Sequence, residues 1–339
     1  MGICNAWITL AKNFGMQILN KYNEVLADHL QRAISKNEPK HLYDPIKYIL
    51  SLGGKRIRPA LTLLICDFFG KDFTAAIPAA LAVELFHNFS LMHDDIMDDA
   101  PLRRGNTTVH EKWDVNTAIL SGDAMLILAY RFFERYEPTT FKELAELFSE
   151  TALEVCEGQQ SDMDFEIREN VSIQEYLKMI EQKTAVLLGA AMKMGAIVAD
   201  ASTREREIIY KFGLNLGIAF QLQDDYLDVY GNPETFGKQI GGDIISNKKT
   251  FLYLMAEREG SAENAAELKH LFSINPSFSD DKINRVQEIF KNSGADQATR
   301  NEIEKYSNIA YNVLDELEIG LDKKDLLRDF GKRLMLREV

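Results

Sequence analysis

The sequence predicts an all-α fold. Apolar residues recur at helical spacing over most of the 339 residues. No stretch alternates apolar and polar residues as a half-buried strand does. The chain holds no low-complexity tract and no domain linker, and its 46% hydrophobic content is enough to bury a large core, as one big helical domain or two smaller ones.

Charge and cysteine content narrow the class of protein. The net charge of -13 disfavours nucleic acid or an anionic membrane surface as a partner. Three scattered cysteines, Cys4, Cys66 and Cys156, form neither a disulfide framework nor a metal-binding spacing. This favours a reducing compartment. No apolar run reaches membrane-spanning length, so we expect a cytoplasmic protein without a membrane span.

The first residues do not resemble a targeting signal. They lack a basic region and a small-residue cleavage site, and Ala6 stands where a myristoylation signal needs Ser or Thr. We therefore expect residues 1–17 to form a short arm and residues 18–339 to form the folded domain. The first helix is predicted over 18–34, where apolar residues recur at helical spacing.

A second helix is predicted over 45–52, and a basic loop follows it. Residues 53–59 read Gly-Gly-Lys-Arg-Ile-Arg-Pro. Two glycines end one helix, and Pro59 suits the first turn of the next. In an acidic protein, such a loop beside a helix N-terminus indicates a diphosphate site, although a solvated basic turn gives the same pattern.

Two helices are predicted between 61 and about 91, with a break near 70–72. The second ends in an aspartate-rich segment, because Pro101 cannot continue it. Asp94 and Asp98 are four residues apart and share a helix face. Their like charges meet the negative end of the helix dipole and need cations, and hard oxygen ligands suit Mg²⁺. An acidic helix end is, however, most often only a solvated terminus.

The same aspartate spacing recurs at 224–228, after the apolar run 212–222. Two carboxylate pairs at the ends of two long helices could face each other across a pocket and hold several cations against one polyanionic ligand. His87 precedes Asp94 by seven residues and lies on roughly the same helix face. It is a further ligand candidate, although a lone histidine in an apolar helix is more often structural.

Residues 115–200 are predicted to form three helical segments, with breaks near Pro138 and Asn170. Lys183 lies in an apolar run, where it would be expensive to bury unpaired. The glycine- and lysine-rich loop 231–250 beside an acidic segment predicts a mobile lid over phosphates. Beyond it the chain reads as amphipathic helices with a polar interruption near 275–280.

Taken together, these motifs resemble the trans-isoprenyl diphosphate synthases of the polyprenyl synthetase family. The ordered set comprises the basic loop 53–59, the two Asp-Asp-x-x-Asp motifs, Arg103-Arg104-Gly105, Lys183-Thr184 and Gln221-Leu222-Gln223. The resemblance covers about residues 18–339. It implies a single large helical bundle around a central cavity, and a homodimer. It also implies an enzyme that condenses isopentenyl diphosphate head-to-tail with dimethylallyl, geranyl or farnesyl diphosphate, using three Mg²⁺ ions.

The resemblance also implies a role for each matching residue. The metal ligands would be Asp94, Asp98 and Asp224, with Asp95, Asp225 and Asp228 close by. Arg103, Lys183 and Lys238 would hold the allylic diphosphate, and Lys55, Arg58, His87 and Arg104 would hold isopentenyl diphosphate. Thr184 and Gln221 would place oxygen dipoles near the developing cation, and Phe220 would pack by the isopentenyl chain. Lys248 matches a family lysine, but the proline that follows it in the family is missing here.

Product length is predicted from Phe89, which lies five residues before Asp94, about 7.5 Å along a helix axis. Its ring would close the floor of the cavity. Phe89 beside the small Ser90, with no insertion in the first aspartate motif, resembles archaeal geranylgeranyl diphosphate synthases. We therefore expect geranylgeranyl diphosphate rather than farnesyl or a longer-chain product. If Phe89 only packs between helices, the floor lies elsewhere.

Two other readings are compatible with parts of the pattern. A class I terpene cyclase or a squalene-type synthase also uses aspartate-rich helices, but would not need the basic loop 53–59 for a second diphosphate. A non-catalytic prenyltransferase subunit typically lacks one acidic motif, whereas both are intact here.

Overall fold

The computed structural model describes residues 19–232, 240–274 and 280–336, and this part confirms the all-α prediction. The chain forms two compact units. The first comprises Met1–Ser149 and Ala190–Glu207, and the second Glu150–Gly189 and Ile208–Val339. The arm predicted for residues 1–17 falls outside the described residues. That residues 18–339 act as one domain stays a prediction.

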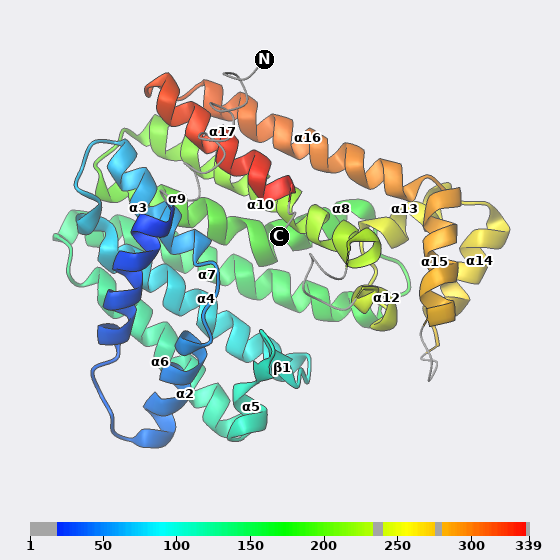
Figure 1. Ribbon diagram of the computed structural model, residues 1–339, viewed down its shortest axis with the longest axis horizontal. Coiled ribbons are helices and arrows are strands. Elements are labelled where there is room, and N and C mark those ends of the chain that lie inside the picture. The colour runs from blue at the N-terminus through cyan, green and yellow to red at the C-terminus, as the bar shows by residue number, and fades with distance from the viewer. Residues whose placement is uncertain (1–18, 233–239, 275–279, 337–339) are drawn as a thin grey trace, which may run out of the picture. The chain divides into compact units, whose positions relative to one another are not determined.

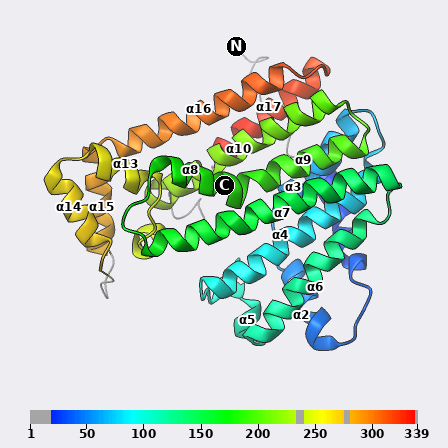
Figure 2. The same ribbon diagram turned by 180° about the vertical axis from the view of Figure 1, so that it is seen from behind.

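The first unit begins with a helix over residues 19–33. The elements that follow are α2 (Lys40–Ser51), α3 (Ile57–Phe68), the 3₁₀ turn η1 (Phe73–Ala76), α4 (Ile77–Met97), α5 (Val109–Lys112), α6 (Val115–Phe133) and the start of α7 (Pro138–Ile167). Figure 1 and Figure 2 both show α4 running alongside α6. α2 begins five residues earlier than predicted. Pro45 lies inside it, in the second turn, although a proline there removes a helical hydrogen bond.

The core of this unit is α4. Its N-terminus carries a proline in the first turn, where the missing N–H has no helical partner to lose. The small residues Ala79, Ala80 and Ala82 are fully buried and let neighbouring helices approach closely. Residues Phe73–Met97 are long and apolar enough to cross a membrane by length and composition, so the prediction that no run reaches that length was wrong. Of the most apolar window, however, 67% is buried inside the protein, as in a core helix.

A short β-ribbon follows α4. Strand β1 (Leu102–Arg103) pairs antiparallel with β2 (Asn106–Thr107), in the register Leu102↔Thr107 and Arg103↔Asn106. Arg104 and Gly105 form the turn, and both have positive φ angles, 53° and 73°. This is the geometry of a tight hairpin turn that follows the twist of the strands. The sequence missed the ribbon because two-residue strands are too short to show alternation.

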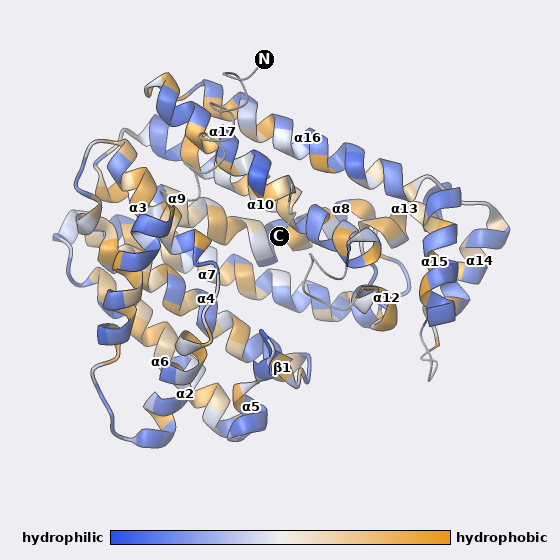
Figure 3. Cartoon of the chain, viewed as in Figure 1, coloured by the Kyte–Doolittle hydropathy of each residue, from blue (hydrophilic) through white to orange (hydrophobic). Residues whose placement is uncertain are grey.

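The second unit contains most of the remaining helices. They are the rest of α7, α8 (Ile173–Ile180), a π-helical turn (Glu181–Ala185), α9 (Val186–Val198), α10 (Thr203–Tyr230), α12 (Gly242–Ile245), α13 (Phe251–Glu259), α14 (Ala262–Leu271), α15 (Asp280–Asn292), α16 (Ala295–Asp315) and α17 (Leu321–Leu336). α9 and α10 each have residues in both units. α15 is mostly hydrophilic in Figure 3, and it buries Val286, Ile289 and Phe290 on one face. Two features were not predicted, namely the short helix α12 inside loop 231–250 and the π-helical turn.

Candidate active site

The first aspartate motif occupies the last turn of α4. The helix ends in a Schellman-type motif, in which Ala100 N–H donates to the Asp95 carbonyl at 2.9 Å and Asp99 N–H donates to the Ile96 carbonyl at 3.3 Å. Asp99 stands at the left-handed position, where glycine is usual, with φ 49°. The helix therefore stops before Pro101, and Asp98 is its C-cap.

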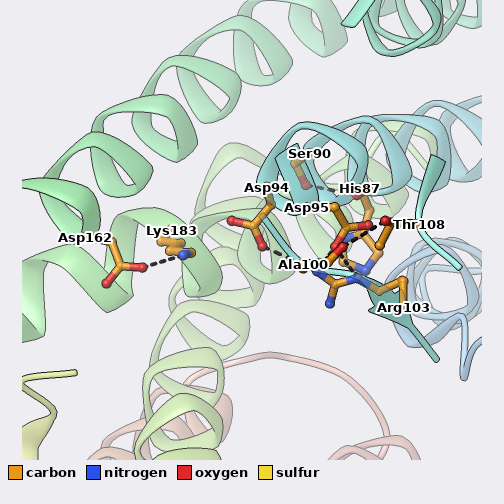
Figure 4. A network of polar contacts seen from close by, with 9 residues as sticks. All are labelled: His87, Ser90, Asp94, Asp95, Ala100, Arg103, Thr108, Asp162 and Lys183. Atoms are coloured by element: carbon orange, nitrogen blue, oxygen red, sulfur yellow. Dashed lines mark hydrogen bonds and ion pairs between the residues drawn. The ribbon is translucent and has the colours of Figure 1, made fainter. Parts of the chain in front are cut away.

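The aspartates of this motif have different environments. Asp95 is 2% exposed, and its Oδ1 accepts both the Nε–H of Arg103, at 2.8 Å, and a second guanidinium N–H (Figure 4). Burial raises the pKa of Asp95, and the charge of Arg103 opposes that rise. Asp94 is half-buried with its Oδ2 at 3.7 Å from Arg103, and Asp98 is exposed. Asp94 and Asp98 thus remain on the accessible face of the helix, whereas Asp95 positions Arg103.

A basic cluster lies further up the same helix. Arg58 of α3 has its guanidinium 3.5 Å from Nε2 of His87 on α4. Burial, and then the charge of Arg58, hold the pKa of His87 well below its usual range, so the imidazole is neutral and its Nε2 can accept a hydrogen bond. The Nε atom of Arg58 is buried, with no hydrogen-bond partner among the described residues. Such a buried donor suits an anionic ligand.

Beneath this cluster is a buried carboxylate that sequence reasoning missed. Glu84 is 4% exposed, and its Oε1 accepts Nδ2–H of Asn88 at 3.1 Å. Burial raises the pKa of Glu84, and the hydrogen bond from Asn88 and then the charges of three arginines lower it. The three are Arg56, Arg104 and Arg58. Glu84 lies one helical turn before His87 in an otherwise mostly apolar run. An acidic residue at such a position is the sequence signal that could have identified it.

The basic loop before α3 lies close to the ribbon turn. The Arg104 guanidinium donates to the carbonyl of Gly53. A Cβ at Gly54 would lie 2.8 Å from Cζ of Arg104, and the φ angle of Gly54, 133°, is one that favours glycine. Lys55 is exposed, and its carbonyl accepts Nδ2–H of Asn23 at 3.2 Å. The structure therefore brings together the four residues predicted to hold isopentenyl diphosphate, Lys55, Arg58, His87 and Arg104, within the first unit.

The two residues predicted to set product length lie between these groups on α4. The Phe89 ring packs in an aromatic row, with its centroid 5.6 Å from that of Phe86 and 4.7 Å from that of His93. Ser90 Oγ–H donates to the His87 carbonyl at 2.9 Å. Phe89 is half-buried, and its role as the cavity floor stays a prediction.

The second aspartate motif occupies the last two turns of α10, near the helix end where it was predicted. The helix continues to Tyr230, because no helix-breaking residue precedes Gly231. Asp225 and Asp228 are buried and Asp224 is half-buried. Asp228 Oδ2 accepts the N–H of Asp243 at 2.9 Å. Phe220 is half-buried one turn before Asp224.

A hydrogen-bonded chain runs from this motif to α8 and the π-helical turn. Tyr176 O–H and, at 2.9 Å, Gln221 Nε2–H both donate to Asp225. Gln221 Oε1 in turn accepts the hydroxyl of Thr184 at 3.1 Å. Burial, and then the charge of Asp243, raise the pKa of Asp225 well above its usual range. The chain fixes the orientation of Thr184 and Gln221, as their predicted role requires.

Lys183 lies in the π-helical turn. Its Nζ donates to Oδ2 of Asp162 at 2.6 Å (Figure 4). A Cβ at Gly158 of α7 would overlap the backbone nitrogen of Lys183 and lie 2.8 Å from its Cα. The close approach of α7 thus depends on Gly158. Asp162 was not predicted as the partner of Lys183, because spacing along the chain does not show which side chains meet.

Two predicted lysines have different outcomes. Lys238 lies outside the described residues. Lys248 is half-buried after α12, and its backbone N–H donates to the Asp243 carbonyl at 2.9 Å. The neighbouring Lys249 binds the carbonyl end of α7, donating to Phe165 at 2.8 Å and to Arg168 at 2.7 Å. The diphosphate roles of Lys238 and Lys248 stay predictions.

Comparison with known proteins gives the family. Residues 39–290 match the model of the polyprenyl synthetase family. The chain belongs to the polyprenyl synthetase family. It is 34% identical over 319 residues to the geranylgeranyl diphosphate synthase of Methanosarcina mazei, covering 92% of this chain and 93% of that protein. A solved geranylgeranyl pyrophosphate synthase is 51% identical with a TM-score of 0.91, covering 95% of this chain and 99% of the other.

One similar structure was solved with bound ligands. A solved geranylgeranyl pyrophosphate synthase of Corynebacterium glutamicum, complexed with isoprenyl diphosphate and magnesium, is 26% identical with a TM-score of 0.83, covering 94% of this chain and 99% of that one. This polyprenyl synthetase is accordingly a prenyltransferase of the isoprenyl diphosphate synthase type. Its family uses isoprenyl diphosphates and is generally Mg²⁺-dependent. The oxygen-only donors Asp94 and Asp98, on one accessible helix face, fit that ion.

Proposed function

We propose that this polyprenyl synthetase condenses isopentenyl diphosphate head-to-tail with allylic diphosphates and releases geranylgeranyl diphosphate. One observation carries the proposal. Helix α4 carries the half-buried Asp94 and the exposed Asp98 at its end and, further up, a neutral His87 beside Arg58 of α3. The first suits a diphosphate bound through metal ions, and the second suits a diphosphate bound directly by cations.

The aspartates serve the allylic substrate. Asp94, Asp98 and Asp224 are the proposed ligands of Mg²⁺, with three ions in all. When bound, Mg²⁺ neutralises charge that develops on the departing diphosphate and so favours breaking of the allylic carbon–oxygen bond. Asp95 positions Arg103, and Asp162 positions Lys183. Both cations are therefore oriented before the substrate arrives, and orienting them adds nothing to the barrier.

The basic cluster serves the second substrate. Arg58, Arg104 and Lys55 balance the charge of isopentenyl diphosphate, and His87 contributes its remaining N–H. Glu84, buried beneath the arginines, partly neutralises the cluster while the diphosphate is absent. The alkene then attacks the allylic cation, so no nucleophilic side chain is needed. The released diphosphate removes the proton.

The hydrogen-bonded chain of Thr184, Gln221 and Asp225 would stabilise the allylic cation. Because Gln221 Nε2 is committed to Asp225, its carbonyl oxygen faces Thr184, and the Thr184 proton points toward that oxygen. The hydroxyl lone pairs of Thr184 are left to face a positive charge. Phe220 lies one helical turn before Asp224 and supplies an apolar surface for the isopentenyl chain.

We also propose a homodimer. Helix α6 leaves the large apolar residues Val115, Ile119, Leu120 and Ile127 exposed, between 42% and 62%. A row of such residues on one helix is typical of an interface. Light scattering of the purified chain tests this proposal, and a monomeric mass at working concentration would contradict it.

Incubation with Mg²⁺, isopentenyl diphosphate and each allylic starter, followed by mass analysis, tests the reaction and the product together. Geranylgeranyl diphosphate as the main product supports the proposal. Farnesyl or a longer diphosphate would leave the reaction intact but overturn the product assignment. Released hydrocarbon would indicate a cyclase, and no turnover by the chain alone would indicate a non-catalytic subunit.

A further inference from the structure

Beside the aspartate motif, the first unit holds a second group of metal-ligating side chains. Asp99 follows the end of α4, and His110 and Glu111 lie on α5. One ligand atom from each of the three lies within 4.8 Å of the others. Nε2 of His110 is 3.9 Å from Oε1 of Glu111. None of these residues belongs to the machinery proposed for prenyl transfer.

The His110 side chain is only 4% exposed. Both of its ring nitrogens are buried, and neither has a hydrogen-bond partner among the described residues. A neutral imidazole carries one N–H and one lone pair, and burial with both unsatisfied is unfavourable. A cation between His110 and the two carboxylates would use the lone pair and would also neutralise the clustered negative charge.

The three residues flank a loop, residues 100–108, whose two ends are joined by hydrogen bonds. Thr108 Oγ1–H donates to the Ala100 carbonyl at 2.8 Å (Figure 4). Thr108 N–H donates to the Pro101 carbonyl at 3.1 Å. The β-ribbon pairs the segments between them. Asp99 at one end of the loop and His110 at the other are therefore brought together by backbone hydrogen bonds that do not depend on a ligand.

We propose that Asp99, His110 and Glu111 bind one divalent transition-metal ion of the Zn²⁺ class. A nitrogen ligand with two carboxylates favours Zn²⁺, Co²⁺ or Mn²⁺ over Mg²⁺, which prefers oxygen ligands alone. Three protein ligands leave a further position for water. Such an ion would link the end of α4 to α5 and so brace the loop that carries Arg103 and Arg104.

The test is a calorimetric titration of the full chain with Zn²⁺, in an excess of Mg²⁺ and without substrate. Asp99→Asn and Glu111→Gln change exposed side chains and should keep the fold, while His110→Asn removes the buried ligand. Asp94→Asn, which removes a proposed Mg²⁺ ligand, is the matched control. We expect wild type and Asp94→Asn to bind one Zn²⁺ and to show a higher Tm with Zn²⁺ than without it. The other three variants should neither bind Zn²⁺ nor show this rise in Tm.

Zinc binding that persists unchanged in Asp99→Asn and Glu111→Gln would overturn the proposal, as would no binding to wild type. Loss of zinc in Asp94→Asn alone would place the ion in the aspartate motif instead. Turnover with Mg²⁺ should stay at the wild-type level in Asp99→Asn and Glu111→Gln. Failure of this site would not affect the proposed prenyl transfer, because the calorimetric measurement uses no substrate.

Discussion

Replacing Gly158 by alanine adds a single methyl group where α7 touches the turn that carries Lys183. The added carbon would overlap the backbone nitrogen of Lys183 and lie 2.8 Å from both its Cα and the carbonyl carbon of Gln182. These are backbone atoms, so no side-chain rotation relieves the overlap. The π-helical turn must move away from α7, and Lys183 then moves away from Asp162, which lies on α7.

The structure allows the losses of stability and of catalytic efficiency to be estimated. Overpacking of this kind destabilises a protein by about 1–3 kcal/mol, and alanine in place of a helical glycine offsets about 0.5–1 kcal/mol. We expect a net loss of about 0.5–2 kcal/mol in the free energy of unfolding. A shift of about 1 Å in a substrate-positioning group can reduce turnover about 10²-fold. kcat/KM for the allylic substrate should therefore fall by about 10- to 100-fold.

The matched control is Gly195→Ala. An added Cβ there would overlap the carbonyl oxygen of Thr62 and lie 3.1 Å from Cβ of Ile65, a comparable clash away from Lys183. Urea denaturation and steady-state kinetics should show a similar loss of stability in both variants, but a large loss in kcat/KM for the allylic diphosphate only in Gly158→Ala. Equal kinetics in the two variants would refute the reasoning.

Further substitutions probe the remaining parts of the site. Asp94→Ala or Asp224→Ala should lower turnover by about 10³-fold at saturating Mg²⁺ with the fold retained, since each removes a proposed metal ligand; near-normal turnover would exclude a metal role for that residue. Arg58→Ala should raise KM for isopentenyl diphosphate about 10- to 100-fold and leave that of the allylic substrate nearly unchanged, because a charged contact is worth about 1.5–3 kcal/mol; an equal rise in both would contradict the assignment. Phe89→Ala should lengthen the product by at least one isoprene unit with turnover largely kept, and an unchanged product would place the floor elsewhere. Burial raises the pKa of Glu84, so its stabilising contribution is full below the unfolded pKa and is lost as pH rises through the folded value. The Tm of Glu84→Gln relative to wild type should therefore rise as the pH is raised from about 5 to about 8, and a constant difference would show that Glu84 does not titrate in this range.

Most helices, and the functional residues that share one helix face, could be predicted from the sequence, because periodicity and spacing are local properties of the chain. Asp94 and Asp98 share a face because the helix sets that geometry, and Arg58 and His87 come together because α3 and α4 pack on each other. What spacing cannot show is which neighbour a side chain takes. That Asp95 turns inward to Arg103 depends on a ribbon too short to detect.

The other misses have the same kind of cause. A tyrosine hydroxyl and an amide satisfy the buried carboxylate of Asp225, and neither partner is evident from an acidic pattern. The π-helical turn at Lys183 packs closely against Gly158, a residue distant in sequence. Local spacing therefore predicts candidates, and tertiary contacts decide their partners.

The carboxylates already paired with Arg103 and Lys183 have a consequence for how the enzyme releases its by-product. Each of these cations has an internal anion at hand, Asp95 at 2.8 Å and Asp162 at 2.6 Å. If Arg103 and Lys183 bind diphosphate as proposed, each shares its positive charge between the diphosphate and the carboxylate that orients it. Inorganic diphosphate would then be held less tightly than by the same cations without resident carboxylates, which would favour its release after the reaction.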